Sequence, residues 1–184
     1  MPLIIIGSEG NVGRRLMAAF PGSIGIDRVP GADIVADIAT IDYDAPDVRA
    51  AFEKADGVIH VATSPNVQAP DSVHWEAVVG AARLMHACDR FGIKRVVLPS
   101  SDWAEPKTRW AENEQNAYGR SKRIMEEMAL MYNMTPGRMC VALRIGWVVH
   151  DLAIVAGAAD WLKANIWDDE RLIGQVKAAL GVKS

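Results

Sequence analysis

The stretch that decides the fold is LIIIGSEGNVG, residues 3–13. Four uncharged apolar residues are followed by three glycines at three-residue spacing, and residues 14–20 then read as a helix. A buried strand, a glycine turn and a helix N-terminus in this order bring backbone N–H groups and the positive end of a helix dipole to one point. The order predicts a binding site for a pyrophosphate group.

Each glycine of the turn has its own task in such a site. Gly7 permits the sharp turn after the strand, Gly10 lets the backbone approach a ligand, and Gly13 lets the helix pack close to the strand. A glycine-rich turn that binds no ligand has the same pattern, so the glycines alone leave both interpretations open.

A second apolar segment, residues 23–26, ends in an acid, Asp27. An acid at this point of a second strand accepts hydrogen bonds from the ribose hydroxyls of adenosine and repels a 2′-phosphate. The predicted cofactor is therefore NAD rather than NADP. The neighbouring Arg28 is a basic residue that can tolerate the phosphate, and it works against this preference.

Composition places the chain among globular proteins. It has 184 residues, 50% of them apolar and 23% charged, and we interpret residues 1–184 as a single domain. The net charge of −3 argues against nucleic acid or an acidic membrane surface as partner and leaves a small-molecule substrate. Cys88 and Cys140 lack zinc-ligand spacing and are expected to be buried, so no metal site is predicted. The start lacks signal-peptide features, and we expect a cytoplasmic enzyme.

Strand-like and helix-like segments alternate along the chain, which predicts a parallel sheet with helices on both faces. The expected fold is a Rossmann-like, doubly wound α/β domain of three layers, with a shortened, mainly helical C-terminal region at 147–184. The expected strands are 3–6, 23–26, 33–38, 56–62, 95–98 and 139–146. The expected helices are 14–20, 47–55, 73–91 and 117–132. Ligands of such sheets lie beyond the carboxyl ends of the strands.

Tyr118 and Lys122 are four residues apart near the start of an expected helix, so their side chains share one face. A phenol with a pKa of about 10 is a poor base at neutral pH, and an ammonium one turn away favours the phenolate. Lys122 can also hold a cofactor ribose hydroxyl, and Ser101, after a neighbouring strand, can steady charge on a substrate oxygen. A solvated helical pair has the same spacing, so the case depends on all these features occurring in one chain.

The motifs together resemble the extended short-chain dehydrogenase/reductases, the NAD-dependent epimerase/dehydratase group. The matching stretches are 7–13, 27, 37–38, 60–63, 100–101, 118–122 and 143–146. The resemblance implies that Ser101, Tyr118 and Lys122 form a catalytic triad with Tyr118 as the acid and base. Within the group, the motifs look most like uronate dehydrogenase and its relatives, which oxidise a sugar acid to a lactone.

The resemblance also implies where the cofactor and the substrate lie. The implied cofactor contacts, beyond those already given, are Asn11 and Val12 at the pyrophosphate, Asp37 and Ile38 at the adenine, and Val61, Ala62 and Thr63 beside the ribose and phosphates. Tyr118 and Lys122 also contact the cofactor. The expected substrate contacts are Ser64, Ser101, Asp102, Trp103, Arg109 and Tyr118. Arg109 could hold a carboxylate or phosphate, although a solvated loop arginine is the simpler interpretation.

The sequence departs from the family pattern at three points. Ala77 stands where the long helix usually carries an asparagine, and only a short region follows Gly146. Asp102-Trp103 after the serine pair is unusual for the family, so the substrate pocket is not expected to be the common one. The segment 148–159 contains no arginine to clasp a sugar acid, so the substrate does not transfer by analogy.

Three functions therefore stay open. The first is hydride transfer between NAD and a small hydroxy or carbonyl substrate, possibly a sugar acid. The second is an NAD-dependent sugar epimerase or dehydratase, and the third is a non-catalytic NAD sensor or scaffold. The resemblance further implies a homodimer joined through the helices at 73–91 and 117–132.

Overall fold

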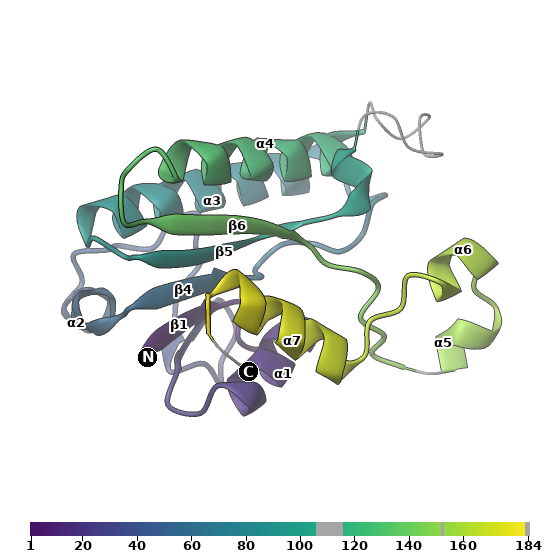
Figure 1. The fold of residues 1–184 in the computed structure, drawn as a ribbon, viewed down its shortest axis with the longest axis horizontal. Coiled ribbons are helices and arrows are strands. Elements are labelled where there is room, and N and C mark those ends of the chain that lie inside the picture. The colour runs from purple at the N-terminus through teal and green to yellow at the C-terminus, as the bar shows by residue number, and fades with distance from the viewer. Residues whose placement is uncertain (106–115, 152, 183–184) are drawn as a thin grey trace.

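The computed structural model describes residues 1–105, 116–151 and 153–182. In these ranges, six parallel strands form one sheet in the order β3-β2-β1-β4-β5-β6 (Figure 1). The strands are β1 (Leu3–Ile6), β2 (Ile24–Asp27), β3 (Ile34–Val35), β4 (Gly57–His60), β5 (Arg95–Ser100) and β6 (Met139–Arg144). This is the strand order of a doubly wound dinucleotide-binding fold, so the predicted fold is confirmed.

The strand order reverses at β1, which pairs with β2 on one side and with β4 on the other. Ile6, at the end of β1, is in register with Ile26 of β2 and with His60 of β4. The carboxyl ends of the central strands therefore reach the same edge, and chains leaving β1 and β4 turn to opposite faces of the sheet. A crevice at such a reversal is where ligands of open α/β sheets bind.

Helices cover both faces of the sheet (Figure 1). Ile4 and Ile6 of β1 pack in a core with α2 (Pro46–Lys54), α3 (Asp71–Arg90) and α4 (Ala117–Tyr132). Leu3 and Ile5 pack in a second core with α1 (Asn11–Ala19) and α7 (Asp169–Ala179). All four residues of β1 are buried, as expected of a strand covered on both faces.

The C-terminal region is mainly helical, as predicted. It contains α5 (Ala153–Ala156), α6 (Asp160–Lys163) and α7, and a short 3₁₀ turn, η1 (Asp102–Ala104), follows β5. Trp167 is buried against Gly146, where a Cβ would lie 2.3 Å from the indole ring. The N–H of Trp147 donates to the carbonyl of Asn165 at 2.8 Å, which ties the segment after β6 to the segment before α7.

Several expected elements have other bounds in the structure. The strand predicted at 33–38 is confined to Ile34–Val35, because the Asp37 carboxylate accepts a hydrogen bond from the Ala39 N–H at 2.8 Å and turns the chain. The first helix begins at Asn11 rather than at residue 14, since Gly10 is extended and caps it. The helix expected at 73–91 is α3, which starts directly after Pro70, and α4 has its expected bounds.

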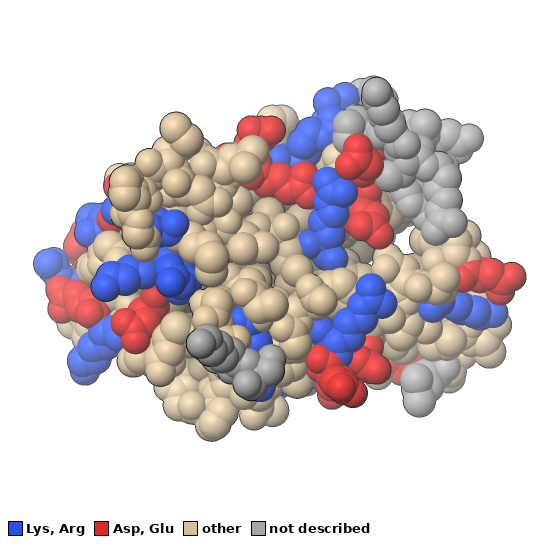
Figure 2. Space-filling model, viewed as in Figure 1, with Lys and Arg blue, Asp and Glu red and all other residues tan. Residues whose placement is uncertain are grey.

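Charges of both signs are interspersed on one face of the molecule. On the face shown in Figure 2, lysines and arginines lie beside aspartates and glutamates rather than in one basic patch. No helix in the described part of the chain has the length and apolar character needed to cross a membrane. Both cysteines are buried thiols, as expected.

Candidate active site

The glycine turn is packed so tightly that two of its positions exclude any side chain. Gly7 has φ +89°, and a Cβ there would lie 2.6 Å from the backbone nitrogen of Ala62. A Cβ on Gly13 would lie 1.9 Å from the carbonyl oxygen of Gly7. Gly10 meets only one atom, at 3.4 Å, and it opens α1. Backbone N–H groups at the start of this helix are therefore exposed to an approaching anion, as a pyrophosphate requires.

Asp27 lies beside this turn, at the end of β2. Its carboxylate accepts a hydrogen bond from the N–H of Glu9 at 2.9 Å and a longer one from Val29 at 3.4 Å. The side chain thus joins the second strand to the turn, with the geometry of an acid that can also accept ribose hydroxyls.

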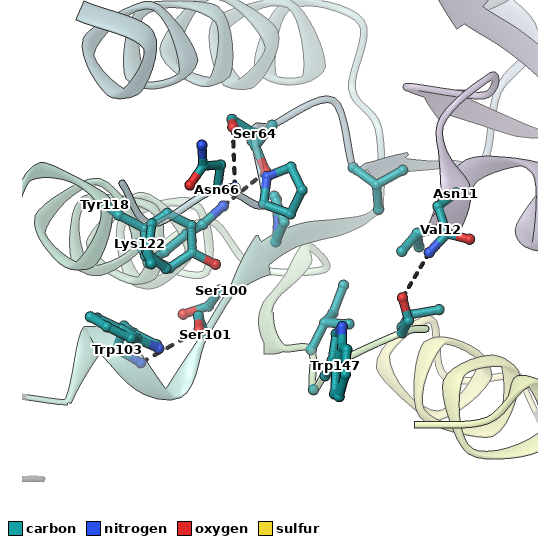
Figure 3. Close-up of a pocket in the computed structure, with 18 of the residues that line it drawn as sticks. Asn11, Val12, Ser64, Asn66, Ser100, Ser101, Trp103, Tyr118, Lys122 and Trp147 are labelled. Carbon is teal, nitrogen blue, oxygen red and sulfur yellow. Dashed lines mark hydrogen bonds between the residues drawn. The ribbon is translucent and has the colours of Figure 1, made fainter. Parts of the chain in front are cut away.

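A cavity of about 620 Å³ runs from the glycine turn along the edge of the sheet. Figure 3 shows Asn11 and Val12 on one side of it and Tyr118, Lys122, Ser101 and Trp103 on the other. The predicted site residues that line it are Gly10, Asn11, Val12, Gly13, Val61, Thr63, Ser64, Ser101, Asp102, Trp103, Tyr118 and Lys122. The structure therefore brings the phosphate turn and the three predicted catalytic residues to one hollow.

Other predicted residues stand outside the cavity wall. These are Gly7, Asp27, Arg28, Asp37, Ile38 and Ala62, which are not among its lining residues. Ile38 instead packs against α3, where a Cβ on Gly80 would lie 2.8 Å from its Cγ2 atom. Arg109 lies outside the described residues.

Local structure fixes the three predicted catalytic side chains. Asn116 caps α4 by accepting the N–H of Gly119 at 2.8 Å, which places Tyr118 in the first turn and Lys122 one turn later. Ser101 caps η1, and its hydroxyl oxygen accepts the N–H of Trp103 at 3.4 Å. The Trp103 ring stands edge-on to Tyr118, with ring centroids 6.2 Å apart.

Lys122 is buried, with 3% of its surface exposed. Its Nζ donates to the Thr63 hydroxyl at 2.9 Å and lies 5.2 Å from the centre of the Tyr118 ring. Burial lowers the pKa of Lys122 to about 7. Burial also raises the pKa of Tyr118, while its hydrogen bond with Ser101 acts in the opposite direction. Desolvation is therefore the largest effect on the pKa of both groups, and the expectation that Lys122 makes the phenol more acidic stays a prediction.

Two neutral histidines lie buried near Lys122. His60 ends β4, and its Nδ1 accepts the N–H of Ala62 at 3.3 Å. Burial, with a smaller effect of Lys122, lowers the pKa of His60 to about 3. His74 of α3 contacts the Tyr118 ring edge-on at 5.5 Å, and burial lowers its pKa as well. At neutral pH these imidazoles add no positive charge beside the amine.

An ion pair ties α4 to the ends of β5 and β6. The Glu126 carboxylate accepts two hydrogen bonds from the Arg144 guanidinium, at 2.7 and 3.1 Å, and one from the Ser100 hydroxyl at 2.7 Å. Arg144 also donates to Glu105 at 3.2 Å. The tie fixes the helix that carries Tyr118 against the strand that ends before Ser101. Sequence reasoning missed Glu126, whose only signal is its place one turn after Lys122.

Further parts of the cavity wall were also missed. They come from residues 145–150 and 161–165, and from the loop after β4, which lies beside Lys122. The unpredicted lining residues include Asn66, Trp147, His150, Trp161, Leu162 and Asn165. Of the two tryptophans in the C-terminal region, Trp167 is buried in the core and Trp161 lines the cavity. A tryptophan signals burial without saying which surface it covers.

A comparison with known families agrees with this geometry. The model of the NAD dependent epimerase/dehydratase family matches residues 3–149. The chain therefore belongs to this family of NAD-dependent enzymes, and its cofactor is NAD. The glycine turn and the start of α1 fit the pyrophosphate of that cofactor, because the helix begins on the cavity at Gly10, which has no side chain to block the phosphates.

Individual relatives have longer chains. An L-arabinose 1-dehydrogenase (NAD(P)+) of Haloferax volcanii is 27% identical over 96% of this chain and 75% of its own length. A mutated uronate dehydrogenase superposes with a TM-score of 0.73 at 23% identity, over 100% of this chain and 70% of its own. A UDP-galactose 4-epimerase gives a TM-score of 0.64 at 22% identity, over 81% of this chain and 57% of its own. The solved structures support the fold, and this chain spans only part of each relative.

Proposed function

We propose that this chain is an oxidoreductase that transfers hydride between NAD and a small hydroxy or carbonyl compound. The observation that carries the proposal is the shared cavity, which joins residues 10–13 to Ser101, Tyr118 and Lys122. A dinucleotide with its pyrophosphate at the turn would extend its nicotinamide toward these three side chains. Bound NAD supplies the acceptor for a hydride.

Each of the three side chains has a distinct role in oxidation. The Tyr118 hydroxyl, as phenolate, takes the proton of the substrate hydroxyl. The Ser101 oxygen accepts the Trp103 N–H, and its hydroxyl, which is bonded to Tyr118 in this structure, would turn to donate to the substrate oxygen. Lys122, when protonated, stabilises the phenolate from its anchor on Thr63. Because burial raises the pKa of Tyr118 and lowers that of Lys122 to about 7, rising pH favours the phenolate but removes the ammonium that stabilises it, so the rate of oxidation should pass through a maximum.

The test replaces the phenol while keeping its ring. We expect Tyr118→Phe to lower kcat by about 10³-fold and to leave NAD affinity unchanged, since the hydroxyl acts on the substrate proton. Turnover is followed by nicotinamide absorbance with sugars, sugar acids and hydroxy acids, and NAD affinity by calorimetry. Tyr132→Phe is the control, because that hydroxyl on the same helix donates to the Ile93 carbonyl, away from the cavity.

Three outcomes would overturn the proposal. One is full activity in Tyr118→Phe. Another is NAD binding without turnover of any compound, which would favour a sensor or scaffold. The third is interconversion of a nucleotide sugar with no net change in nicotinamide absorbance, which would indicate an epimerase.

Asp27 supports a preference for NAD over NADP. Its carboxylate already borders the turn through Glu9 and would repel a 2′-phosphate. We expect kcat/KM to be at least about tenfold higher with NAD, and Asp27→Ser to reduce that ratio. An equal ratio in both proteins would exclude Asp27 as the determinant.

The homodimer through α3 and α4 is also a proposal. Trp75 and Val79 lie one turn apart on α3 with 64% and 50% of their surfaces exposed, and Met131 of α4 is 71% exposed. Large exposed apolar side chains on one pair of helices are typical of an interface. Light scattering tests it: a monomer would contradict it, and a dimer that Trp75→Glu dissociates would support it.

A further inference from the structure

The substrate end of the cavity has an unusual balance of charge. The ionisable residues that line the cavity, among those the structure describes, are Asp102, Tyr118, Lys122 and His150. His150 belongs to the phosphate end, because the nearby Val148 carbonyl accepts the Asn11 side chain of α1 at 2.8 Å. Tyr118 and Lys122 serve the reaction. Asp102 is therefore the formal charge in this part of the wall that the mechanism does not use.

Asp102 is joined to the opposite wall of the cavity. Its Oδ2 accepts a hydrogen bond of 3.4 Å from the side-chain amide of Asn165, which follows α6. The carboxylate comes directly after Ser101 and is exposed to the cavity. A carboxylate with an amide beside it offers acceptors and a donor to neighbouring hydroxyl groups, as sugar recognition requires.

Indole rings form much of the remaining wall at this end. Trp103, Trp147 and Trp161 all line the cavity, and each is partly buried. An apolar wall with a few placed polar groups is the usual composition of a small-molecule site. Flat aromatic faces suit the C–H faces of a sugar ring, whose hydroxyls would then point to Asp102, Asn165 and Ser64.

Among the described residues near this end, Arg144 is paired with carboxylates and Arg123 is bonded to a backbone carbonyl. Arg144 is held by Glu126 and Glu105 at 2.7 and 3.2 Å, and neither it nor Arg123 lines the cavity. The Nε of Arg123 donates to the Ala104 carbonyl at 2.9 Å. A substrate carboxylate at this end would meet the negative charge of Asp102, and like charges placed beside each other disfavour binding.

We propose that the site takes an uncharged sugar of monosaccharide size, and that Asp102 and Asn165 bind its hydroxyls while Asp102 selects against carboxylates. The proposal rests on the proposed oxidoreductase function. It replaces the expected sugar acid with a neutral sugar as the substrate. Asp102 is a binding and specificity residue here, and the hydride and proton steps stay with the triad.

The test compares sugars that differ only in charge at C6. D-galactose with D-galacturonate and D-glucose with D-glucuronate form two matched pairs, measured by NADH formation. We expect kcat/KM to be at least about tenfold higher for the neutral member of any pair that is turned over. Asp102→Asn should raise the ratio of uronate to sugar about tenfold, by removing the repulsion. Asp160→Asn, which removes an exposed charge on α6, is the matched control and should leave the ratio unchanged.

The possible outcomes distinguish the neutral-sugar proposal from the proposed oxidoreductase function. Preference for the uronate, or an unchanged ratio in Asp102→Asn, would overturn the neutral-sugar assignment while leaving the oxidoreductase intact. Turnover of hydroxy acids alone would do the same. No turnover of any compound in the panel, with NAD bound, would overturn both. An equal shift in the ratio for Asp160→Asn would show a general charge effect and would remove Asp102 from the specificity argument.

Discussion

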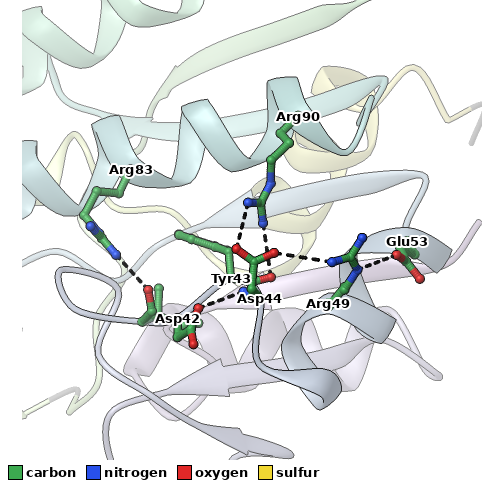
Figure 4. Close-up of polar contacts among 8 residues, drawn as sticks. Asp42, Tyr43, Asp44, Arg49, Glu53, Arg83 and Arg90 are labelled. Atoms are coloured by element: carbon green, nitrogen blue, oxygen red, sulfur yellow. Dashed lines mark hydrogen bonds and ion pairs between the residues drawn. The ribbon is translucent and has the colours of Figure 1, made fainter.

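The two halves of the sheet's carboxyl edge are held in different ways. In the β4–β6 half, which carries Ser101, Tyr118 and Lys122, the contacts are buried or charge-assisted, as in the Glu126–Arg144 pair. In the β1–β3 half, the loop of residues 37–45 buries Ile41 and Tyr43 in the core, and its polar contacts with the helices come from exposed arginines. Figure 4 shows Arg90 and Arg49 meeting Asp44, with side chains 40%, 55% and 59% exposed.

The difference concerns what each half must keep fixed. A proton transfer loses rate steeply when its partners shift by an ångström, so the reacting groups need contacts that hold one geometry. An adenosine half needs only a surface of the right shape and sign, and exposed ion pairs of about 0–1 kcal/mol suffice to hold a loop there. Substitutions in the β4–β6 half should therefore change kcat, and those in the β1–β3 half should change mainly the cofactor KM.

The largest effect is expected at Gly13, where the two halves meet. A Cβ added at Gly13 would lie 1.9 Å from the carbonyl oxygen of Gly7. Because this oxygen belongs to the backbone, it cannot shift without distorting the turn. Gly13→Ala should destabilise the fold by on the order of 3 kcal/mol and abolish NAD binding. Gly174→Ala on α7 is the control, because that site is open and alanine should add about 0.5–1 kcal/mol. Thermal unfolding and calorimetry with NAD measure both, and wild-type behaviour of Gly13→Ala would show that the turn can relax.

The next effect tests the tie that holds the β4–β6 half. Glu126→Gln removes the charge that Arg144 and Ser100 share, so the spacing of Ser101 and Tyr118 should loosen. We expect kcat to fall about 10–100-fold with NAD affinity within about threefold. Glu127→Gln, the exposed neighbour on α4, is the matched control. A normal kcat in Glu126→Gln, or an equal loss in Glu127→Gln, would mean that the ion pair does not position the reacting groups.

Local patterns made the β1 strand, the glycine turn and α4 predictable. Residues 3–6 could be assigned because the segment is short, apolar and followed by glycine, and Tyr118 and Lys122 because their spacing is helical. Each of these signals is local and spans no more than about a dozen residues. The ion pair of Glu126 with Arg144 joins a helix to a strand, and it could not be predicted before the order of the strands was known. The turn at Asp37 was missed because a side-chain hydrogen bond ended a segment that had the composition of a strand.

The physical state of the triad was the least predictable part. Spacing placed Lys122 beside Tyr118 but gave no information on burial, and burial dominates the pKa values of both residues. The wall at 145–165 was unpredictable for a similar reason. Its tryptophans predict an apolar surface. Only the fold shows that Trp161 lines the cavity while Trp167 packs in the core.

A smaller effect concerns stability, because burying Lys122 has a cost. Its pKa of about 7 lies below the unfolded value, so the unfolded chain binds the extra proton between pH 7 and about 10.5. Stability should therefore rise with pH through this window. Lys122→Met should be inactive yet more stable than wild type by on the order of 2 kcal/mol at pH 7, and the gap should close toward pH 10.

Urea unfolding from pH 6.5 to 10 measures this dependence, with Lys94→Met, which removes an exposed amine, as the control. His60 and His74 face Lys122 and stay neutral across this range, and the rise in the Tyr118 pKa acts only above pH 10. If the difference in unfolding free energy between wild type and Lys122→Met did not change with pH, the amine would be solvated. The β4–β6 half would then not lower the stability of the fold by burying a charge.

The smallest effect should come from the β1–β3 half. Arg90 donates to Asp44 at 3.1 Å and to the Tyr43 carbonyl at 3.2 Å, both in partial contact with water. Arg90→Ala should lower the free energy of unfolding by less than about 1 kcal/mol, and this difference should disappear in high salt. The NAD KM should rise by no more than about threefold. Arg49→Ala, which lacks the contact with the main chain, should cost less still. Because Arg90 touches the loop and not the triad, kcat should not change. A fall in kcat as large as that in Glu126→Gln would mean that the loop of residues 37–45 is coupled to the reacting groups, and that one network, rather than two, holds the edge of the sheet.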